Sequence, residues 1–217
     1  MKSFLAWIAA TGALVATGAQ ATPIRLDGPE TNLQQVLNTY TGSGTLDATT
    51  DQHALDEAFA FSGFNIGLAG IIVELAGYKD LNAFGIYDIL DPTNRHEILG
   101  GHANACPASS CAAAFTLPGT FTSSVFGFYL DTPDGLWFSQ SSLNTDGADH
   151  MVAYQLGGSY IFGWEDLASS RWDQDYNDFV VLVSGVRGVN VPEPATLGLL
   201  GLGVLGVGAF RRRKQAV

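Results

Sequence analysis

The stretch MVAYQLGGSYIFGW, residues 151–164, predicts two β-strands joined by a tight turn. Met151 to Leu156 and Tyr160 to Trp164 are short runs rich in apolar and aromatic residues, a pattern typical of strands. Gly157-Gly158-Ser159 lies between them, and short connections that contain glycine join antiparallel strands. The segment therefore predicts an antiparallel sheet.

Runs of the same kind recur along the chain, each bounded by turn residues. They are Ile71 to Leu75, Phe84 to Tyr87, Ser124 to Leu130, Leu136 to Ser139 and Phe179 to Val183. Asp131-Thr132-Pro133-Asp134-Gly135 predicts a second hairpin loop. Many short strands without alternating helices favour a mainly β fold, either an antiparallel β-sandwich or a jelly roll.

A short N-terminal helix is predicted ahead of the strands. Thr31-Asn32-Leu33-Gln34 has the T-x-x-Q form of a capping box, and Leu33, Val36 and Leu37 recur at helical spacing. We expect this helix to end near Tyr40, followed by a polar linker.

Both ends of the chain carry targeting patterns. Lys2, an apolar run and Ala19-Gln20-Ala21 predict a secretory signal that is cleaved before Thr22. The apolar residues 195–210, followed by Arg211, Arg212, Arg213 and Lys214, predict a C-terminal membrane helix with a cytoplasmic tail. We expect a signal peptide in residues 1–21, the helix and linker in 22–50, a β-sandwich domain in 51–190 and a sorting signal in 191–217.

The expected exported part, Thr22 to Val191, is strongly acidic. Of the 21 acidic residues only Glu193 lies outside it, whereas five of the 10 basic residues do, so 20 acids against 5 bases give a net charge of −15. Such a charge disfavours nucleic acid as a partner and favours contacts bridged by divalent cations.

The chain has two cysteines, Cys106 and Cys111. Because export leads to an oxidising compartment, we expect them to form a local disulfide. A metal pair or a redox-active dithiol is the alternative, although no further cysteine or histidine pair stands at zinc spacing.

No catalytic motif is present, so no catalytic residue is assigned. The sequence lacks a G-x-S-x-G elbow and a P-loop, and the glycine-rich match at residues 201–206 lies within the predicted membrane helix. His96 and His102 do not have the spacing of a zinc-protease helix, and we expect them, like His53 and His150, to be loop residues without a ligand role. A glycosidase with two carboxylates stays open, with Trp137, Trp164 and Trp172 as sugar platforms.

The densest polar cluster precedes the last predicted strand, and it supplies the candidate metal ligands Glu165, Asp166, Asp173, Asp175, Asn177 and Asp178. Asp173, Asp175 and Asn177 alternate as in a calcium loop, but Asp178 and Ser184 replace residues that an EF-hand requires. The sequence therefore predicts a calcium site outside the EF-hand class. The alternative is a tight turn in which Asp and Asn side chains satisfy backbone groups.

Two resemblances bear on the function. Pro192-Glu193-Pro194, the apolar run after it, and the basic residues Arg211, Arg212 and Arg213 together resemble a PEP-CTERM sorting signal. This resemblance implies recognition by an exosortase-type processing enzyme, transit through the inner membrane, and a setting of exopolysaccharide and biofilm.

The exported domain is similar to an uncharacterised bacterial family of secreted β domains with a G-[FW]-E-D-L and D-x-D-[FY]-N-D pattern, here in residues 163–167 and 173–178. That resemblance implies location and fold, and its members often accompany calcium-dependent surface modules. We therefore expect an exported, non-catalytic protein of the cell surface or extracellular matrix that binds calcium and contacts exopolysaccharide. The alternative is a glycan-active hydrolase.

Overall fold

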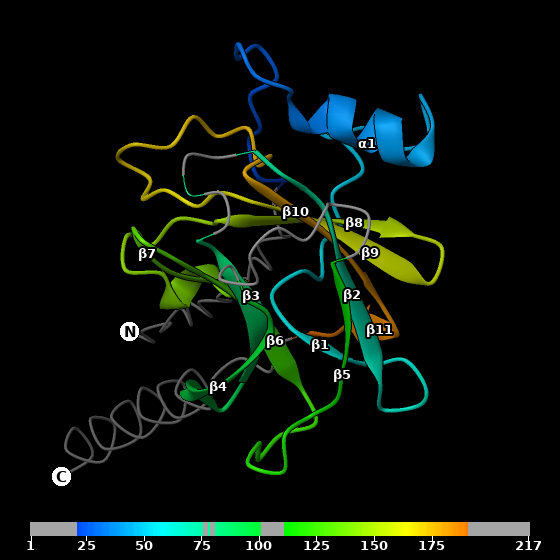
Figure 1. The fold of residues 1–217 in the computed structure, drawn as a ribbon, viewed down its shortest axis with the longest axis vertical. Coiled ribbons are helices and arrows are strands. Elements are labelled where there is room, and N and C mark those ends of the chain that lie inside the picture. The colour runs from blue at the N-terminus through cyan, green and yellow to red at the C-terminus, as the bar shows by residue number, and fades with distance from the viewer. Residues whose placement is uncertain (1–20, 76–77, 79–80, 101–110, 191–217) are drawn as a thin grey trace, which may run out of the picture.

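The computed structural model describes residues 21–75, 78, 81–100 and 111–190, and these form two antiparallel sheets (Figure 1). The first sheet has the order β11 (Val186–Gly188), β1 (Phe59–Phe61), β6 (Phe126–Thr132), β3 (Ala83–Asp88), β4 (Asp91–Leu99), with β7 (Gly135–Phe138) also paired to β6. The second has the order β5 (Ala112–Phe115), β2 (Gly67–Glu74), β10 (Phe179–Ser184), β9 (Ser159–Trp164), β8 (Met151–Leu156). A single 3-10 turn, Ser141–Leu143, follows β7 among the described residues.

The two sheets pack face to face through an aromatic core. Phe59 and Phe128 of the first sheet each contact Phe162 of the second, with ring centroids 5.2 and 5.0 Å apart. Phe84 of β3 lies 5.9 Å from Phe179 of β10. All five rings are buried, and burial of one such side chain contributes about 1.5–3 kcal/mol. The predicted mainly β fold with antiparallel sheets is confirmed, and its architecture is a sandwich.

Helix α1 (Leu33–Thr41) covers the outer face of the second sheet (Figure 1). Side chains alternate across a strand, so the residues of β8 and β9 that do not face the sandwich core face the helix. Leu33, Val36 and Leu37 pack against this outer set, Val152, Tyr154 and Ile161. Both faces of these strands are therefore buried, which explains why residues 151–164 are apolar almost throughout.

The helix begins one residue later than predicted. Asn32 is the N-cap, and its side chain accepts a hydrogen bond from the Gln35 backbone N–H at 3.0 Å. In turn, the Asn32 backbone N–H donates to Gln35 Oε1 at 3.1 Å. The predicted box of Thr31 and Gln34 is wrong by one position. Asn and Thr both cap helices well, and the consecutive glutamines made either register possible in the sequence.

Both predicted hairpins are present. β8 and β9 are joined through Gly157 and Gly158, with Leu156 paired to Ser159 and Gly157 at a φ of +60°. β6 and β7 are joined in the same way, with Thr132 paired to Gly135.

The sequence pattern did not predict four strands, β1, β4, β5 and β11. β4 is the clearest case, because it lies at a sheet edge, most of its side chains are exposed, and it contains Pro92, which an edge strand tolerates. The prediction that His96 lies in a loop is wrong, since His96 is part of β4 and pairs with Ile86. His102 lies outside the described residues.

The predicted signal peptide, residues 1–21, falls outside the described residues except for Ala21, and the sorting signal and membrane helix of residues 191–217 fall wholly outside them. No helix in the described part of the chain is long and apolar enough to cross a membrane. Cys111 is disulfide-bonded, but Cys106 lies outside the described residues and the pairing of the two stays a prediction.

Candidate metal centre

The ends of two paired strands place the acidic cluster. β9 ends at Trp164, β10 begins at Phe179, and these two residues are partners in the ladder that joins the strands. Residues 165–178 therefore form a loop that leaves the sheet and returns to the same point (Figure 1). Acids at the two ends of this loop are brought close together by the strand pairing.

Three carboxylates converge within the loop, and we refer to Glu165, Asp173 and Asp175 as the acidic triad. One oxygen from each lies within 4.8 Å of the others. Glu165 is fully buried, Asp175 is 3% exposed, and Asp173 is exposed. Calcium ligands lie about 2.4 Å from the ion, so two ligands on opposite sides are about 4.8 Å apart. The triad therefore has the spacing of a set that can share one ion.

The loop backbone adopts an unusual conformation between these acids. Gln174 and Tyr176 have φ values of +65° and +54°, the left-handed region in which residues other than glycine are uncommon. Tyr176 is held there because its ring is fully buried and its hydroxyl donates to the Asp149 carbonyl oxygen at 2.7 Å. Such backbone strain costs about 1–3 kcal/mol and clusters at functional sites.

One oxygen of the triad has no partner. Glu165 Oε1 accepts a hydrogen bond from the Tyr176 backbone N–H at 2.8 Å, whereas Glu165 Oε2 is buried without a hydrogen-bond donor. Leaving such a group unsatisfied costs about 1–3 kcal/mol. A cation bound by the triad would supply the missing partner.

Asn177 positions the triad through its amide nitrogen. Its Nδ2 donates to Asp175 Oδ2 at 2.6 Å and to the Thr31 carbonyl oxygen at 2.8 Å. Both partners are acceptors, which fixes the orientation of the amide and directs Oδ1 away from them, where it has no partner. A ligand role for Asn177 stays a prediction.

Burial and repulsion favour the protonated forms of the triad. Burial, together with the smaller effect of the Asp173 and Asp175 charges, raises the pKa of Glu165 to about 8. Burial and then Asp173 raise the pKa of Asp175 to about 6. Glu165 therefore holds a proton at neutral pH, and a cation that binds there must displace it.

Asp166 and Asp178 lie outside the triad and form a second group, the buried pair. Asp178 Oδ2 accepts from the Asp166 backbone N–H at 3.0 Å, and Asp166 Oδ2 accepts from Asn82 Nδ2 at 3.0 Å. The Asp166 carbonyl oxygen accepts from Trp137 Nε1 at 3.2 Å and from Thr132 Oγ1 at 3.0 Å. Burial, followed by the Asp166 charge, raises the pKa of Asp178 to about 9. The single cluster of the sequence is therefore two groups in space.

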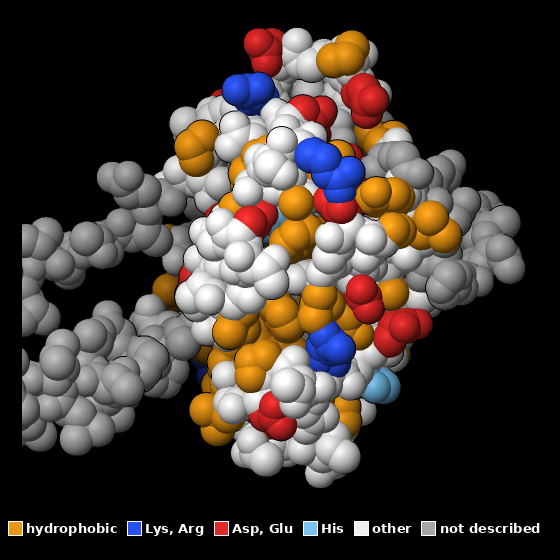
Figure 2. Space-filling view, turned by 90° about the vertical axis from the view of Figure 1, so that its left-hand side faces the viewer, with side chains coloured by type: hydrophobic (Ala, Val, Ile, Leu, Met, Phe, Trp, Pro, Cys, Tyr) orange, Lys and Arg blue, Asp and Glu red, His pale blue; other side chains and the backbone are white. Residues whose placement is uncertain are grey.

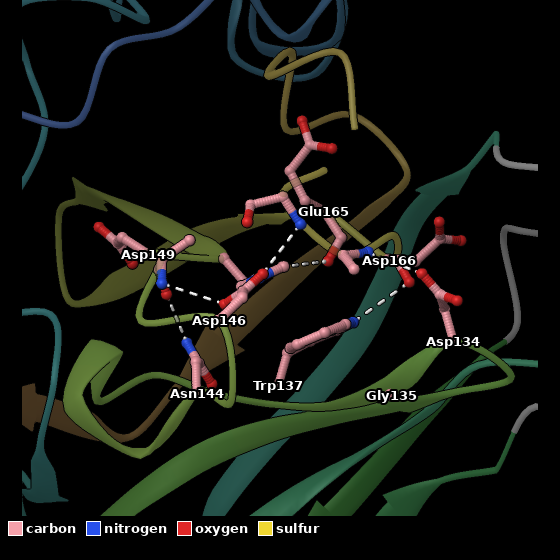
Figure 3. A network of polar contacts seen from close by, with 12 residues as sticks. Asp134, Gly135, Trp137, Asn144, Asp146, Asp149, Glu165 and Asp166 are labelled. Carbon is pink, nitrogen blue, oxygen red and sulfur yellow. Dashed lines mark hydrogen bonds and ion pairs between the residues drawn. The ribbon is translucent and has the colours of Figure 1, made fainter. Parts of the chain in front are cut away.

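A buried histidine, His150, anchors the start of the loop, next to Trp137 and Glu165, which are labelled in Figure 3. His150 stacks on Trp137 with ring centroids 3.9 Å apart and an angle of 3° between the planes. Its Nε2 lies 3.0 Å from Asp146 Oδ2, and its Nδ1 lies 3.3 Å from the Glu165 carbonyl oxygen. The Glu165 N–H donates back to the His150 carbonyl oxygen at 3.0 Å. Both the backbone N–H and the carbonyl group of Glu165 therefore contact His150.

Sequence reasoning missed two residues that contact the loop, Thr31 and Asn82, and the role of Tyr176 within the loop. Thr31 and Asn82 lie 146 and 84 positions from their partners, so no local pattern could identify them. The hypothesis of tryptophan sugar platforms fails for two residues, because Trp137 is 2% exposed and Trp164 is fully buried. Trp172 is partly exposed.

The exposed acids do not gather into one patch on the face drawn in Figure 2, where Asp and Glu side chains are scattered over a mostly neutral surface. The convergence of carboxylates is a property of the loop after β9, where two of the three members are buried.

Comparison with protein families gave two matches. Residues 190–214 match the PEP-CTERM protein-sorting motif. The chain carries a PEP-CTERM sorting motif. Residues 113–186, which run from β5 to the start of β11 and include the whole acidic loop, are similar to a domain of unknown function, DUF4114. No curated protein and no solved structure matched the chain. The PEP-CTERM motif indicates an exported protein that passes through a membrane-anchored stage and is recognised by an exosortase-type enzyme.

Proposed function

We propose that this protein is a non-catalytic component of the cell surface or extracellular matrix whose β-sandwich is stabilised by one calcium ion. The observation that carries the proposal is the convergence of Glu165, Asp173 and Asp175, one of which has a buried oxygen without a hydrogen-bond partner. The sorting motif supports the exported setting, where calcium is available at higher concentration than inside a cell.

The chemistry of the triad favours calcium over other metals. Its donors are carboxylate oxygens, without the nitrogen or sulfur ligands that zinc prefers. Calcium accepts six to eight oxygens in irregular geometry, whereas magnesium demands near-ideal octahedral geometry. Because Asp173 is exposed, water or an external oxygen can complete the coordination.

The position of the triad couples metal binding to folding. The loop leads directly into β10, which lies between β2 and β9 in the second sheet and contributes Phe179, Val181 and Val183 to the core. A cation that fixes the loop therefore stabilises the entry to a central strand. A ligand at 100 times its dissociation constant adds about 2.7 kcal/mol to the free energy of unfolding.

Thermal melting tests the proposal. In millimolar calcium the protein should melt about 5–10 °C higher than in chelator, with a smaller rise in magnesium. Replacing both Asp173 and Asp175 by Asn should abolish the shift and leave the fold intact in chelator.

A matched control is the double change Asp47→Asn and Asp51→Asn, which removes the same charge from two exposed acids and should keep the shift. Equal melting temperatures of the wild type in calcium and in chelator would show that the loop is only a turn.

Exopolysaccharide is the proposed partner. The expected exported part, Thr22 to Val191, carries 20 acids against 5 bases, and this net charge of −15 repels acidic polymers directly. Contact with an anionic polysaccharide therefore requires a bridging divalent cation. Cosedimentation with the polysaccharide of the source bacterium should therefore need calcium, and binding that is unchanged in chelator contradicts the bridge.

A glycan-active hydrolase is the second candidate. It is favoured by a buried carboxyl group with a raised pKa, Glu165, beside the exposed carboxylate of Asp173, an arrangement that a general acid requires. Release of reducing sugars from the same polysaccharide, lost in Glu165→Gln, would establish this activity in place of the non-catalytic role.

A further inference from the structure

Thr22, the first residue of the expected mature chain, is held at every polar atom. Its backbone nitrogen donates to Gln52 Oε1 at 2.7 Å, and its carbonyl oxygen accepts from Gln52 Nε2 at 2.8 Å. Its hydroxyl donates to Asp149 Oδ2 at 2.5 Å. Chain ends usually fray unless they are tied down, so this degree of fixation is unusual for a terminus.

The surroundings of Thr22 are acidic. Asp149 interacts electrostatically with Asp56 and Glu57, and burial raises the pKa of Asp149. Burial, followed by the charge of Asp149, raises the pKa of Asp56 to about 7. In the part of the chain that the structure describes, no Lys or Arg forms an ion pair with these three acids, and His150 is the basic group that faces Asp149. Asp56, Glu57 and Asp149 therefore have no Lys or Arg partner among the described residues.

We propose that the α-ammonium group of Thr22, created when the leader is removed, is the cation of this acidic group and pairs with Asp149. In the cleavage, water splits the Ala21–Thr22 peptide bond, Ala21 leaves as a carboxylate, and the Thr22 nitrogen takes the protons. The nitrogen that had one hydrogen to donate then has three and a positive charge. It stands on the same residue whose hydroxyl already contacts Asp149.

The chain segment that follows Thr22 connects this ion pair to the loop of the acidic triad. The Arg25 backbone N–H donates to the Gln174 carbonyl oxygen at 2.7 Å, and the Thr31 carbonyl oxygen accepts from Asn177. Ile24 and Leu26 pack against the cluster between α1 and the second sheet. Removal of the leader thus completes the fold at the edge of the loop that carries the triad. The inference rests on the export part of the proposed function.

The test compares two forms of the full chain after processing in an exporting host, with the N-terminus verified by intact mass. One form begins at Thr22, and the other carries one inserted Ala before it, which moves the ammonium group away without changing any side chain. In chelator the extended form should melt about 3–6 °C lower. Asp149→Asn should remove this difference. Equal melting of the two forms, or an equal difference in Asp149→Asn, overturns the proposal.

A second measurement applies if Asp149→Asn does not fold. The α-amine of the folded wild type should react with an acylating reagent at pH 7 at least tenfold more slowly than in urea, and an equal rate overturns the pairing. Use of chelator keeps the test independent of calcium. If the natural leader is cut elsewhere, the predicted cleavage fails, and a substitute leader cut before Thr22 still tests the pairing.

Discussion

The acidic triad and the buried pair are neighbours in the chain, but the triad alone brings three carboxyl groups together and includes a buried oxygen without a hydrogen-bond donor. In the buried pair, one carboxyl oxygen of each Asp accepts from an N–H group, and burial raises the pKa of Asp178 to about 9. The triad brings three carboxyl groups together and leaves Glu165 Oε2 buried without a hydrogen-bond donor. The comparison teaches that acidity in a sequence does not distinguish carboxyl groups that fasten a loop by hydrogen bonds from carboxyl groups that converge on one another.

The largest effect should come from breaking the buried pair. Asp178→Ala removes the acceptor of the buried Asp166 N–H and should lower the free energy of unfolding by about 3–4 kcal/mol, equally in calcium and in chelator. Asp178→Asn should cost less than about 1 kcal/mol, because an amide imitates a protonated carboxyl group. Denaturant unfolding measures both variants. A large loss in Asp178→Asn would show that the carboxylate form is required.

The next effect is a dependence of stability on pH in chelator. The folded-state pKa values of Glu165 and Asp178, about 8 and about 9, lie above the unfolded values near 4, so the folded state binds more protons between these limits. Their stabilisation is present in full below about pH 4 and is lost as pH rises through 8 to 9. Calcium should reduce the part of this pH dependence that comes from Glu165. Melting temperatures from pH 5 to 9 with and without calcium measure this, and a rise with pH in chelator would contradict it.

A matched pair of variants separates the two groups directly. Glu165→Gln should reduce the stabilisation by calcium by about 2 kcal/mol, because it removes one charged ligand. Asp166→Asn, one residue away, should keep the stabilisation. Calcium titration by calorimetry measures both, and an equal loss in the two variants would mean that triad and pair act as one site.

The smallest effect concerns the strained backbone of the triad loop. Gln174→Gly relieves a left-handed residue at a φ of +65° and should stabilise the protein by about 0.5–1 kcal/mol in chelator. Gln155→Gly, on strand β8, should instead destabilise by a similar amount. Thermal melting compares the two, and destabilisation by both glycines would show that Gln174 is not strained.

Local patterns predicted the apolar strands, both hairpins and the acidic loop, because each depends on residues close in sequence. The polar edge strand β4 was missed, since an edge with exposed side chains has no apolar alternation to reveal it. The division of the acids was missed because adjacent residues such as Glu165 and Asp166 direct their side chains to different sides of the chain, as Figure 3 shows. Asn82, which contacts Asp166 from 84 positions away, is set by the tertiary fold alone.

Strand β4 has a consequence for an exported protein, which leaves the cytoplasmic chaperones that use ATP. An edge strand offers unpaired backbone groups on which a second molecule can add its own strand. In β4 the exposed Asp91, Arg95 and Glu97 place charges along that edge, and Pro92 removes one N–H from it. These features oppose strand addition by a second copy of the chain at this edge, even at high local concentration.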